Sequence, residues 1–553
     1  MFITFLSNLF ISFVILGYSY VFKSILNKNR NILIYNLDFL YGLFFLIFLF
    51  TIINFLLPLS IVKVGVCFFG VIFFFYSTIK RFVKVDFAFL VFFLLVFSIF
   101  TYYNSNNVDS PVYHLQTINW IHNYKIPFGL AILDWHYALN SVWHILLAGL
   151  SFKYDNFNSI YVLGYIPFAF IFTESLNVRK KVSLSNLTLF LCCSFLLVFS
   201  IIHPFRNGII FNHLGNPEVD TVAMIFFICA SFIFFKYIET ENVDDFNLLI
   251  LCSIICPLIK LSYIGALIYP FAAVLLKKKN LYKLFNKYSI FSFILFLIWS
   301  LRNLILSSCF IFPIKSTCIN TAWSLSNEQV SFYLNQTKSF ARDTTLRSKY
   351  LDFDHTLNSF DWLVPWLKDY FINDAFLNIT IAILIFSLTG ILIKKIFFNP
   401  KKNFKTLKFV LFILIIYITN FYIWFQAPEI RFGWGILLFF PCLILSLLLL
   451  ELKIFNFPMI KYKYYSLILL SFILINKNLN NFKFEHIKKP FNKNFSYSNI
   501  IKIMTINDYN IYRSLNWQCA DFKEICINKP KKHYFIEEKM NYIFISTKDK
   551  ETV

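Results

Sequence analysis

A carboxylate at the start of a polar segment is the clearest candidate for chemistry in this chain. Asp109 lies in the segment 107–114, with the sequence NVDSPVYH, directly after an apolar run. Ser110 and Pro111 predict that a helix begins here, because a hydroxyl caps a first turn and proline suits the first helical position. Asp109 therefore has two interpretations: a reactive group that faces water, or a charge that only complements the positive helix end.

A second acid-bearing segment follows further along the chain. The stretch 216–220 reads NPEVD, and Asp220 begins another long apolar run. A carboxylate close to lipid costs free energy unless it has a partner or a task. We therefore expect Glu218 and Asp220 to share a site with Asp109, provided that both segments face the same side of a membrane.

Three cations accompany these acids. Lys260 lies between two half-length apolar segments, Arg302 near the end of an apolar helix, and Arg431 in a short polar loop, 426–431. Guanidinium groups bind phosphate oxygens through paired hydrogen bonds. The cations predict an anion site, with the alternative that each reaches the membrane surface or pairs with a nearby acid.

The elements that must position these residues are transmembrane helices. Hydrophobic residues make up 58% of the 553 residues and charged residues 14%, which excludes an ordinary soluble protein. Runs of about 20 apolar residues, long enough to cross the hydrocarbon core of a bilayer, recur along the chain. We predict an all-α polytopic membrane protein with about 12–14 transmembrane helices. The expected crossings are 2–22, 37–59, 61–79, 85–103, 157–177, 186–202, 219–238, 287–308, 374–396, 406–425, 433–452 and 462–476. The segment 141–152 is short, and 247–276 reads as two half-length helices around Pro257 and Lys260.

Positive charge orients the chain, because Lys and Arg favour the cytoplasmic side. Placing the basic clusters inside leaves the loops 104–140, 203–218, 309–370 and 426–431 outside, together with the tail. This predicts a transmembrane domain, 1–476, and a small outer domain, 477–553, with a strand-like stretch at 542–545. The net charge of +22 comes largely from the clusters and the tail and suits anionic lipid head groups. The lipid bilayer is an expected partner; nucleic acid is not, because the chain carries no nucleic-acid motif.

Four of the eleven cysteines fall in the expected outer segments. They are Cys309, Cys318, Cys519 and Cys526. Their spacing permits two short-loop disulfides, Cys309–Cys318 and Cys519–Cys526, in an oxidising compartment, and a zinc site is the alternative.

Taken together, these residues resemble the GT-C superfamily of polytopic glycosyltransferases, which includes aminoarabinose transferases and protein mannosyltransferases. Asp109 occupies the place of the acid in the first outer loop, and NPEVD at 216–220 looks like the second acidic motif. The stretch 428–432, PEIRF, is similar to the late loop in which an arginine contacts a lipid phosphate. A closer likeness is to an uncharacterised bacterial family of such proteins, carried by 109–115, 129–141, 302–313, 428–433 and 517–519. Many relatives have Asp-Glu in the first loop, whereas Ser110 follows Asp109 here.

The resemblance implies a GT-C-like fold and an enzyme of the bacterial inner membrane with its active face outside. Its donor is a polyprenyl-phosphate-linked sugar and its acceptor a glycan or lipid, in synthesis of a cell-surface polysaccharide or lipopolysaccharide. Asp109 is expected to act as the catalytic base. Arg431, with Arg302 or Lys260, is expected to hold the phosphate. Glu218 and Asp220 are expected to position the acceptor or a divalent ion, Mg or Mn, although no cofactor is certain. His114 and Glu429 complete the substrate-binding candidates.

Two rival functions stay open. A polysaccharide polymerase uses the same kind of donor but moves a whole repeat. A transporter or flippase of lipid-linked glycans belongs to another class, in which internal repeats and helices broken at mid-membrane are typical. Charges gathered at one face favour the enzyme, and a membrane subunit without catalysis is the remaining alternative.

Overall fold

The computed structural model describes most of the chain. The described residues are 2–26, 32–100, 109–154, 157–161, 163–176, 183–202, 215–277, 281–343, 353–397, 404–452, 468–473, 499–506, 509–516, 518–520, 522, 524–527 and 534–547. The predicted crossing 462–476, most of the outer loop 203–218 and much of the tail therefore lie largely outside them.

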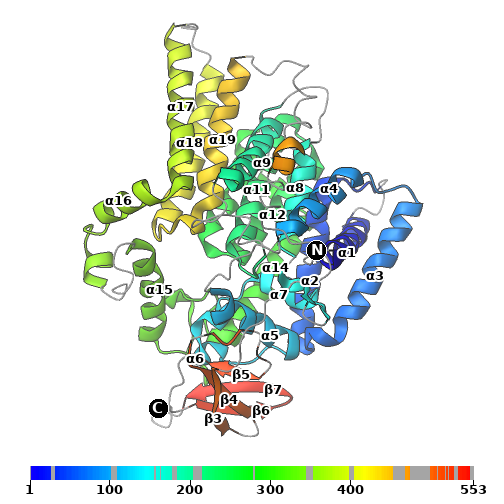
Figure 1. The fold of residues 1–553 in the computed structure, drawn as a ribbon, viewed down its shortest axis with the longest axis vertical. Coiled ribbons are helices and arrows are strands. Elements are labelled where there is room, and N and C mark those ends of the chain that lie inside the picture. The colour runs from blue at the N-terminus through cyan, green and yellow to red at the C-terminus, as the bar shows by residue number, and fades with distance from the viewer. Residues whose placement is uncertain are drawn as a thin grey trace.

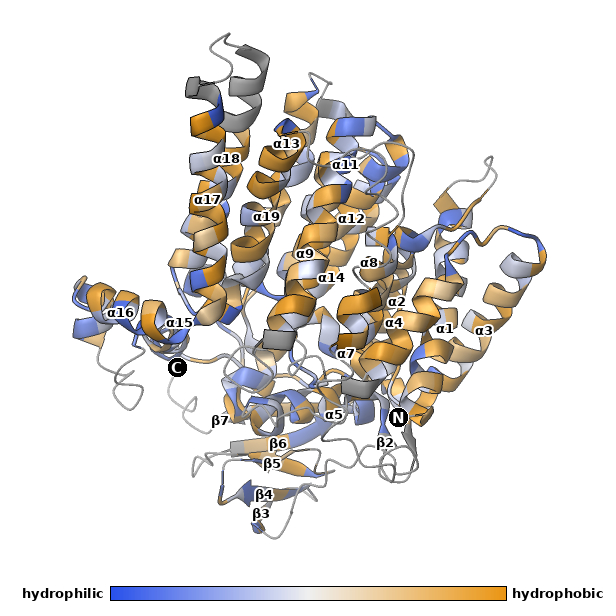
Figure 2. Cartoon of the chain, turned by 45° about the horizontal axis from the view of Figure 1, so that its top comes forward, coloured by the Kyte–Doolittle hydropathy of each residue, from blue (hydrophilic) through white to orange (hydrophobic). Residues whose placement is uncertain are grey.

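Long apolar helices form the body of the molecule, because a helix satisfies its own backbone hydrogen bonds where no water is present. They are α1 (Phe2–Leu26), α2 (Phe39–Leu56), α3 (Leu59–Ile79), α4 (Phe87–Phe100), α8 (Tyr165–Leu176), α9 (Leu184–Ile202), α11 (Asp220–Thr240), α12 (Val243–Ile259), α13 (Ile268–Leu276), α14 (Lys287–Ser307), α17 (Ala375–Phe397), α18 (Phe404–Phe425) and α19 (Trp434–Glu451). Figure 2, in which each residue is coloured by its hydropathy, shows that apolar residues predominate in these helices.

Among the described residues, eight helical segments are long and apolar enough to cross a membrane. They are 2–26, 36–56, 59–79, 159–176, 220–240, 287–307, 375–394 and 430–451. Four shorter apolar segments accompany them: 87–98, 184–200, 261–276 and 412–425. These segments indicate a multi-pass membrane protein, and each coincides with or overlaps a crossing or half-helix expected from the sequence.

The segment 247–276 is interrupted at Lys260. Helix α12 ends at Ile259, Lys260 has an extended backbone, and a 3-10 helix, η6 (Leu261–Leu267), leads into α13. The break therefore falls at the lysine itself, whereas Pro257 is accommodated inside α12.

Short helices and turns make a layer at one end of the long helices. They are η3 (Ser110–His114), α5 (Leu115–Asn123), α6 (Leu130–Leu133), η4 (Trp135–Ala138), α7 (Val142–Gly149), the hairpin β1 (Lys153–Tyr154) and β2 (Phe157–Asn158), α15 (Asn327–Arg342), η10 (Asp354–Asn358), α16 (Leu363–Asn373) and η11 (Ile430–Gly433). Helix α5 buries Leu115, Ile118 and Ile121 against the body, as expected for a helix that lies across the bundle end. Figures 1 and 2 show α5, α15 and α16 at the same end as the C-terminal strands.

The described part of the tail is β-structure, so the all-α expectation applies to the membrane part alone, where the short hairpin of β1 and β2 is an exception. Strands β3 (Ile500–Ile506) and β4 (Tyr509–Ser514) pair antiparallel, and β5 (Ile525–Ile527) adds parallel to β4. Strands β6 (Tyr534–Lys539) and β7 (Tyr542–Thr547) form a hairpin. The backbone of Phe128 pairs with Ile543 and Ile545, which fixes β7 against the loop before α6. The strand-like stretch 542–545 noted in the sequence lies in β7.

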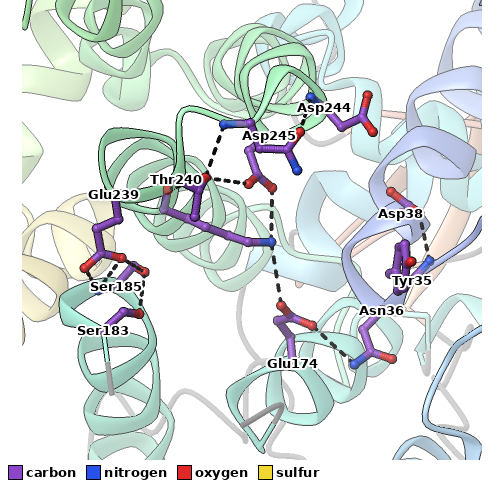
Figure 3. A network of polar contacts seen from close by, with 12 residues as sticks. Tyr35, Asn36, Asp38, Glu174, Ser183, Ser185, Glu239, Thr240, Asp244 and Asp245 are labelled. Atoms are coloured by element: carbon purple, nitrogen blue, oxygen red, sulfur yellow. Dashed lines mark hydrogen bonds and ion pairs between the residues drawn. The ribbon is translucent and has the colours of Figure 1, made fainter. Parts of the chain in front are cut away.

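A buried polar network ties helices together at the opposite end of α11 (Figure 3). Lys236 Nζ lies 3.0 Å from Asp245 Oδ1 and 4.0 Å from Glu174 Oε1. The other oxygen of Glu174 accepts a hydrogen bond of 3.2 Å from Asn36 Nδ2, and Thr240 donates to Asp245. The network therefore joins α8, α11, α12 and the turn η1 (Asn36–Asp38).

Candidate functional site

Residues from four separate segments meet at the end of the bundle that carries the short helices. Arg431 Nη1 lies 2.7 Å from Asp109 Oδ2, and Arg431 Nε lies 3.8 Å from Asp220 Oδ2. Lys260 donates a short hydrogen bond to Asp220 Oδ1. Asp109 stands just before η3, Asp220 begins α11, Lys260 occupies the helix break and Arg431 lies in η11. Four of the residues singled out from the sequence thus form one connected group.

The ring of Phe432 completes the surroundings of Lys260. Lys260 Nζ lies 3.6 Å from the centre of that ring, an arrangement in which the ring face attracts the cation. The Phe432 carbonyl accepts a hydrogen bond of 3.0 Å from Ser262 Oγ in η6. The helix break and the late loop are therefore bound to each other directly.

Helix α16 holds the late loop in place. Trp366 Nε1 donates to the Pro428 carbonyl at 3.2 Å, and the Tyr370 hydroxyl donates to Glu429 Oε2 at 3.0 Å. Glu429 Oε1 is in turn 3.8 Å from Arg431 Nε. Glu429 therefore lies between Tyr370 and Arg431 and links α16 to the guanidinium group.

Exposure is graded across the group. The side chain of Asp220 is 7% exposed and that of Lys260 16%, whereas Arg431 is 20% and Asp109 28% exposed. Asp109 is thus the most exposed of the four side chains and Asp220 the most buried.

The arrangement suits a metal ion poorly. Lys260 binds one oxygen of Asp220 and Arg431 lies near the other, so Asp220 is engaged by cations. Glu218, in the same segment as Asp220, is also buried. In the described part of the chain no three His, Cys, Asp or Glu side chains are grouped to hold a metal.

His114 faces a second histidine at the edge of the site. It is buried, and its Nδ1 lies 3.0 Å from Nε2 of His144. Burial lowers the pKa of His114 from 6.5 to about 3 and also lowers that of His144. Both rings are thus neutral near pH 7, one donating and the other accepting, and this nitrogen of His114 is already engaged before any substrate binds.

This neutral pair predicts a pH-dependent stability. Below about pH 6.5 these two histidines are protonated in the unfolded chain but stay neutral in the folded protein. The free energy of unfolding therefore falls as the pH drops. The slope reaches at most about 1.4 kcal/mol per pH unit for each proton. We expect His114→Gln, which cannot titrate, to show a shallower fall of the melting temperature between pH 7.5 and pH 5, in about that proportion. His355→Gln, in the partly exposed turn η10, serves as control, and an unchanged slope in His114→Gln would contradict the assignment.

Arg302 lies apart from the group. It is 2% exposed, and its Nη1 donates a hydrogen bond of 2.6 Å to Asn54 Oδ1 in α2. Asn54 also donates to the carbonyls of Ile121 and Tyr124. Within the described residues Arg302 thus joins α14 to α2 and α5 and makes no contact with Asp109 or Arg431. The expectation that it assists Arg431 at a phosphate has no support in this geometry.

The four cysteines that the sequence placed in outer segments pair as their spacing suggested. Cys309 bonds to Cys318 and Cys519 to Cys526. The second pair closes a loop that lies on the helix of Asp109: Ala520 N donates to the Pro111 carbonyl at 2.7 Å, and Gln116 Nε2 donates to the Ala520 carbonyl at 3.1 Å. The tail therefore helps to fix η3 and α5.

Sequence reasoning missed the aromatic residues of the site. Phe432, Tyr370 and Tyr113 carry no charge and are three among many aromatic side chains, so composition hides them. One signal was present: Tyr113 follows Asp109 by four residues, which places both on one face of a helical turn. Burial raises the pKa of Tyr113 well above its usual value, and the negative charge of Asp109 adds to this effect. The Tyr113 hydroxyl therefore stays protonated beside the acids.

A family model described as a domain of unknown function (DUF8201) matches residues 1–438. No curated protein and no solved structure matches the chain. The matched range contains all of the charged group around Arg431 and ends before the strands of the tail.

Proposed function

This chain belongs to the family of the domain of unknown function (DUF8201), and we propose that it is a membrane glycosyltransferase of the GT-C type. It would move a sugar from a polyprenyl-phosphate-linked donor to a glycan or lipid acceptor during cell-surface glycan synthesis. One observation carries the proposal: Asp109 and Arg431, a base and a phosphate binder, lie 2.7 Å apart at the exposed rim of a site built from four segments.

The ion pair suggests how the site would work. The phosphate of the donor competes with Asp109 for Arg431, since guanidinium groups bind phosphate oxygens strongly. Asp109, once released, accepts the proton of an acceptor hydroxyl while that oxygen bonds to the anomeric carbon of the sugar. The bond from this carbon to the phosphate oxygen breaks, and polyprenyl phosphate leaves with the electron pair, stabilised by Arg431. Lys260 holds Asp220 in place, and Glu429 holds Arg431 in place.

The proposal places the protein in the bacterial inner membrane with this site facing outward. The long apolar helices support membrane insertion, and the basic clusters that follow the predicted crossings support this orientation. A donor with a polyprenyl tail would enter from the bilayer beside the helices, and the acceptor from water.

One observation favours a different class, the transporter of lipid-linked glycans. The chain is broken at Lys260 inside an apolar hairpin, as is typical of transporters. A polymerase would use the transferase chemistry above and differ only in the size of the group moved.

The test that separates transfer from transport is deletion of the gene. For a transferase or polymerase, the lipid-linked sugar should accumulate on the outer leaflet, where a membrane-impermeant oxidant such as periodate reaches it. For a transporter it should accumulate on the inner leaflet and stay protected. Mass spectrometry of extracted polyprenyl lipids, with and without oxidant, reads out both, and restoration by the wild-type gene is the control. No accumulated lipid and an unchanged surface glycan would contradict the proposal.

A further inference from the structure

Helix α16 carries exposed apolar side chains along one side. Val364, Leu367 and Phe371 are spaced three and four residues apart, so they share one face of the helix. Their exposed fractions are 72%, 37% and 49%, and we call these three residues the apolar stripe. Phe360 and Ile372, at the two ends of the helix, are 78% and 68% exposed and extend the apolar surface. Exposed apolar side chains that gather in this way mark a surface that binds another molecule or a membrane.

A different face of α16 is aromatic and buried. Trp366 and Tyr370 are 4% and 8% exposed, and they bind Pro428 and Glu429 of the late loop. Trp366 also packs against Trp424, at the end of α18, with ring centroids 6.2 Å apart. Helix α16 therefore holds the loop of the charged site with one face and presents the apolar stripe to its surroundings with another.

Helix α16 is joined directly to a helix that can cross the membrane. Asp374 alone separates it from α17, and Asn378 Nδ2 of α17 donates to the Phe371 carbonyl at 2.8 Å across the corner. Figures 1 and 2 show α16 extending sideways from the end of α17, away from the other long helices. Helix α17 is itself long, apolar and open to its surroundings, with Ile385 and Phe386 57% and 66% exposed. Acyl chains that surround α17 thus lie within reach of α16.

We propose that α16 lies in the surface of the bilayer, with the apolar stripe among the acyl chains, and that it thereby sets the depth of Arg431. A helix of this kind buries its apolar face about 5–10 Å into the boundary between head groups and acyl chains. The late loop, bound to the aromatic face, then holds the Arg431 guanidinium close to the level of the lipid phosphate groups. This placement of α16 holds whichever reaction the site performs.

The residues beside the apolar stripe favour a bilayer over a protein partner. Lys368 is exposed and follows Val364 by four residues, so it borders the stripe. A lysine in this position keeps its methylene groups among acyl chains while its ammonium group reaches lipid phosphates. Trp362 and Trp366 accompany it, and tryptophan is enriched where hydrocarbon meets head groups. One helix thus carries the three kinds of side chain that a membrane surface accommodates.

The test measures the depth of a fluorophore at chosen positions of the full chain in phosphatidylcholine nanodiscs. Val364→Cys and Phe371→Cys, in the stripe, and Asn373→Cys, at an exposed polar residue outside it, are labelled with a nitrobenzoxadiazole maleimide. Seven of the eleven native cysteines are buried and four form disulfides, so the unsubstituted protein serves as the labelling blank. We expect 5-doxyl phosphatidylcholine to quench the two stripe labels at least about twofold more than the label at position 373, and aqueous iodide to do the reverse.

A second set of variants tests whether α16 sets the depth of the late loop. Gln426→Cys carries the same fluorophore in that loop. Val364→Glu with Phe371→Glu puts charge into the stripe and should lower doxyl quenching at position 426 about twofold, because charge is costly among acyl chains. Val243→Glu with Phe285→Glu, at exposed apolar residues outside α16, is the matched control and should leave the quenching unchanged. A normal elution volume in size-exclusion chromatography verifies that each variant is folded.

Three outcomes would overturn the proposal. Quenching of the stripe labels by iodide alone would show that the stripe faces water. Protection from both quenchers would show that a second copy of the chain, or another protein, covers the stripe. Unchanged quenching at position 426 in the folded Val364→Glu, Phe371→Glu variant would show that α16 anchors only itself and does not set the depth of Arg431.

Discussion

Asp109→Asn is expected to lower sugar transfer about 10²–10⁴-fold, the range that a positioned general base contributes. Asparagine has nearly the same shape, and its amide oxygen still accepts a hydrogen bond from Arg431, so the site should stay assembled. It cannot take the proton of the acceptor hydroxyl. The lipid-linked sugar that accumulates after gene deletion supplies the donor, and its consumption by purified variants in nanodiscs measures the loss.

The control for this substitution is Asp361→Asn, at an exposed acid in the same layer of short helices, between η10 and α16. It should leave turnover unchanged. Donor binding should also persist in Asp109→Asn, so that kcat falls while KM for the donor changes little. Full turnover in Asp109→Asn at a normal protein level would contradict the role of Asp109 as a base. Asp109 would then only precede the helix and neutralise Arg431.

Lys236→Met is expected to destabilise the protein by about 3–5 kcal/mol, because it leaves buried carboxylates without their cation. Asp245 and Glu174 are both buried and both face Lys236 Nζ. Methionine fills similar volume, so the loss reports charge and not a cavity. Thermal unfolding in detergent, followed by retention of the monodisperse peak in size-exclusion chromatography, measures the shift.

Lys277→Met is the matched control. Lys277 pairs with Glu241 at 3.1 Å, but the Glu241 side chain is 45% exposed. An exposed pair contributes about 0–1 kcal/mol, so this variant should melt close to wild type. Equal melting of the two variants would show that the network at the end of α11 adds no stability.

The sequence predicts that the charged residues lie together, because this depends only on the pattern of apolar runs and charges along the chain. Positive clusters after alternate apolar runs place Asp109, Asp220 and Arg431 at the same end of the bundle, whichever helices neighbour each other. The break at Lys260 is visible as a charge inside an apolar segment. The presence of each transmembrane helix, and the side of the membrane on which each loop is expected, both follow from patterns within about 20 residues.

Contacts across the bundle are not encoded in such patterns. Arg302 and Arg431 look alike in sequence, each near the end of an apolar helix, yet Arg302 turns toward Asn54. The direction in which a helix end faces depends on packing with distant segments. The same holds for His136, whose ring meets Tyr113 and Trp135 only because η3 and η4 fold together. The strands of the tail were partly visible as the apolar run 542–545, but their contact with Phe128 was not.

The contact between the tail and η3 has a consequence for the order of biogenesis. The segment that carries Asp109 is synthesised well before the loop closed by Cys519 and Cys526, and Gln116 and Ala520, which a hydrogen bond joins, are 404 positions apart. The segment of Asp109 can therefore take its final setting only after this loop has been synthesised and has folded onto Pro111 and Gln116. In the glycosyltransferase that we propose, a chain stalled before Cys519 would lack this support for its base, so the timing of assembly would itself withhold catalysis until the loop is in place.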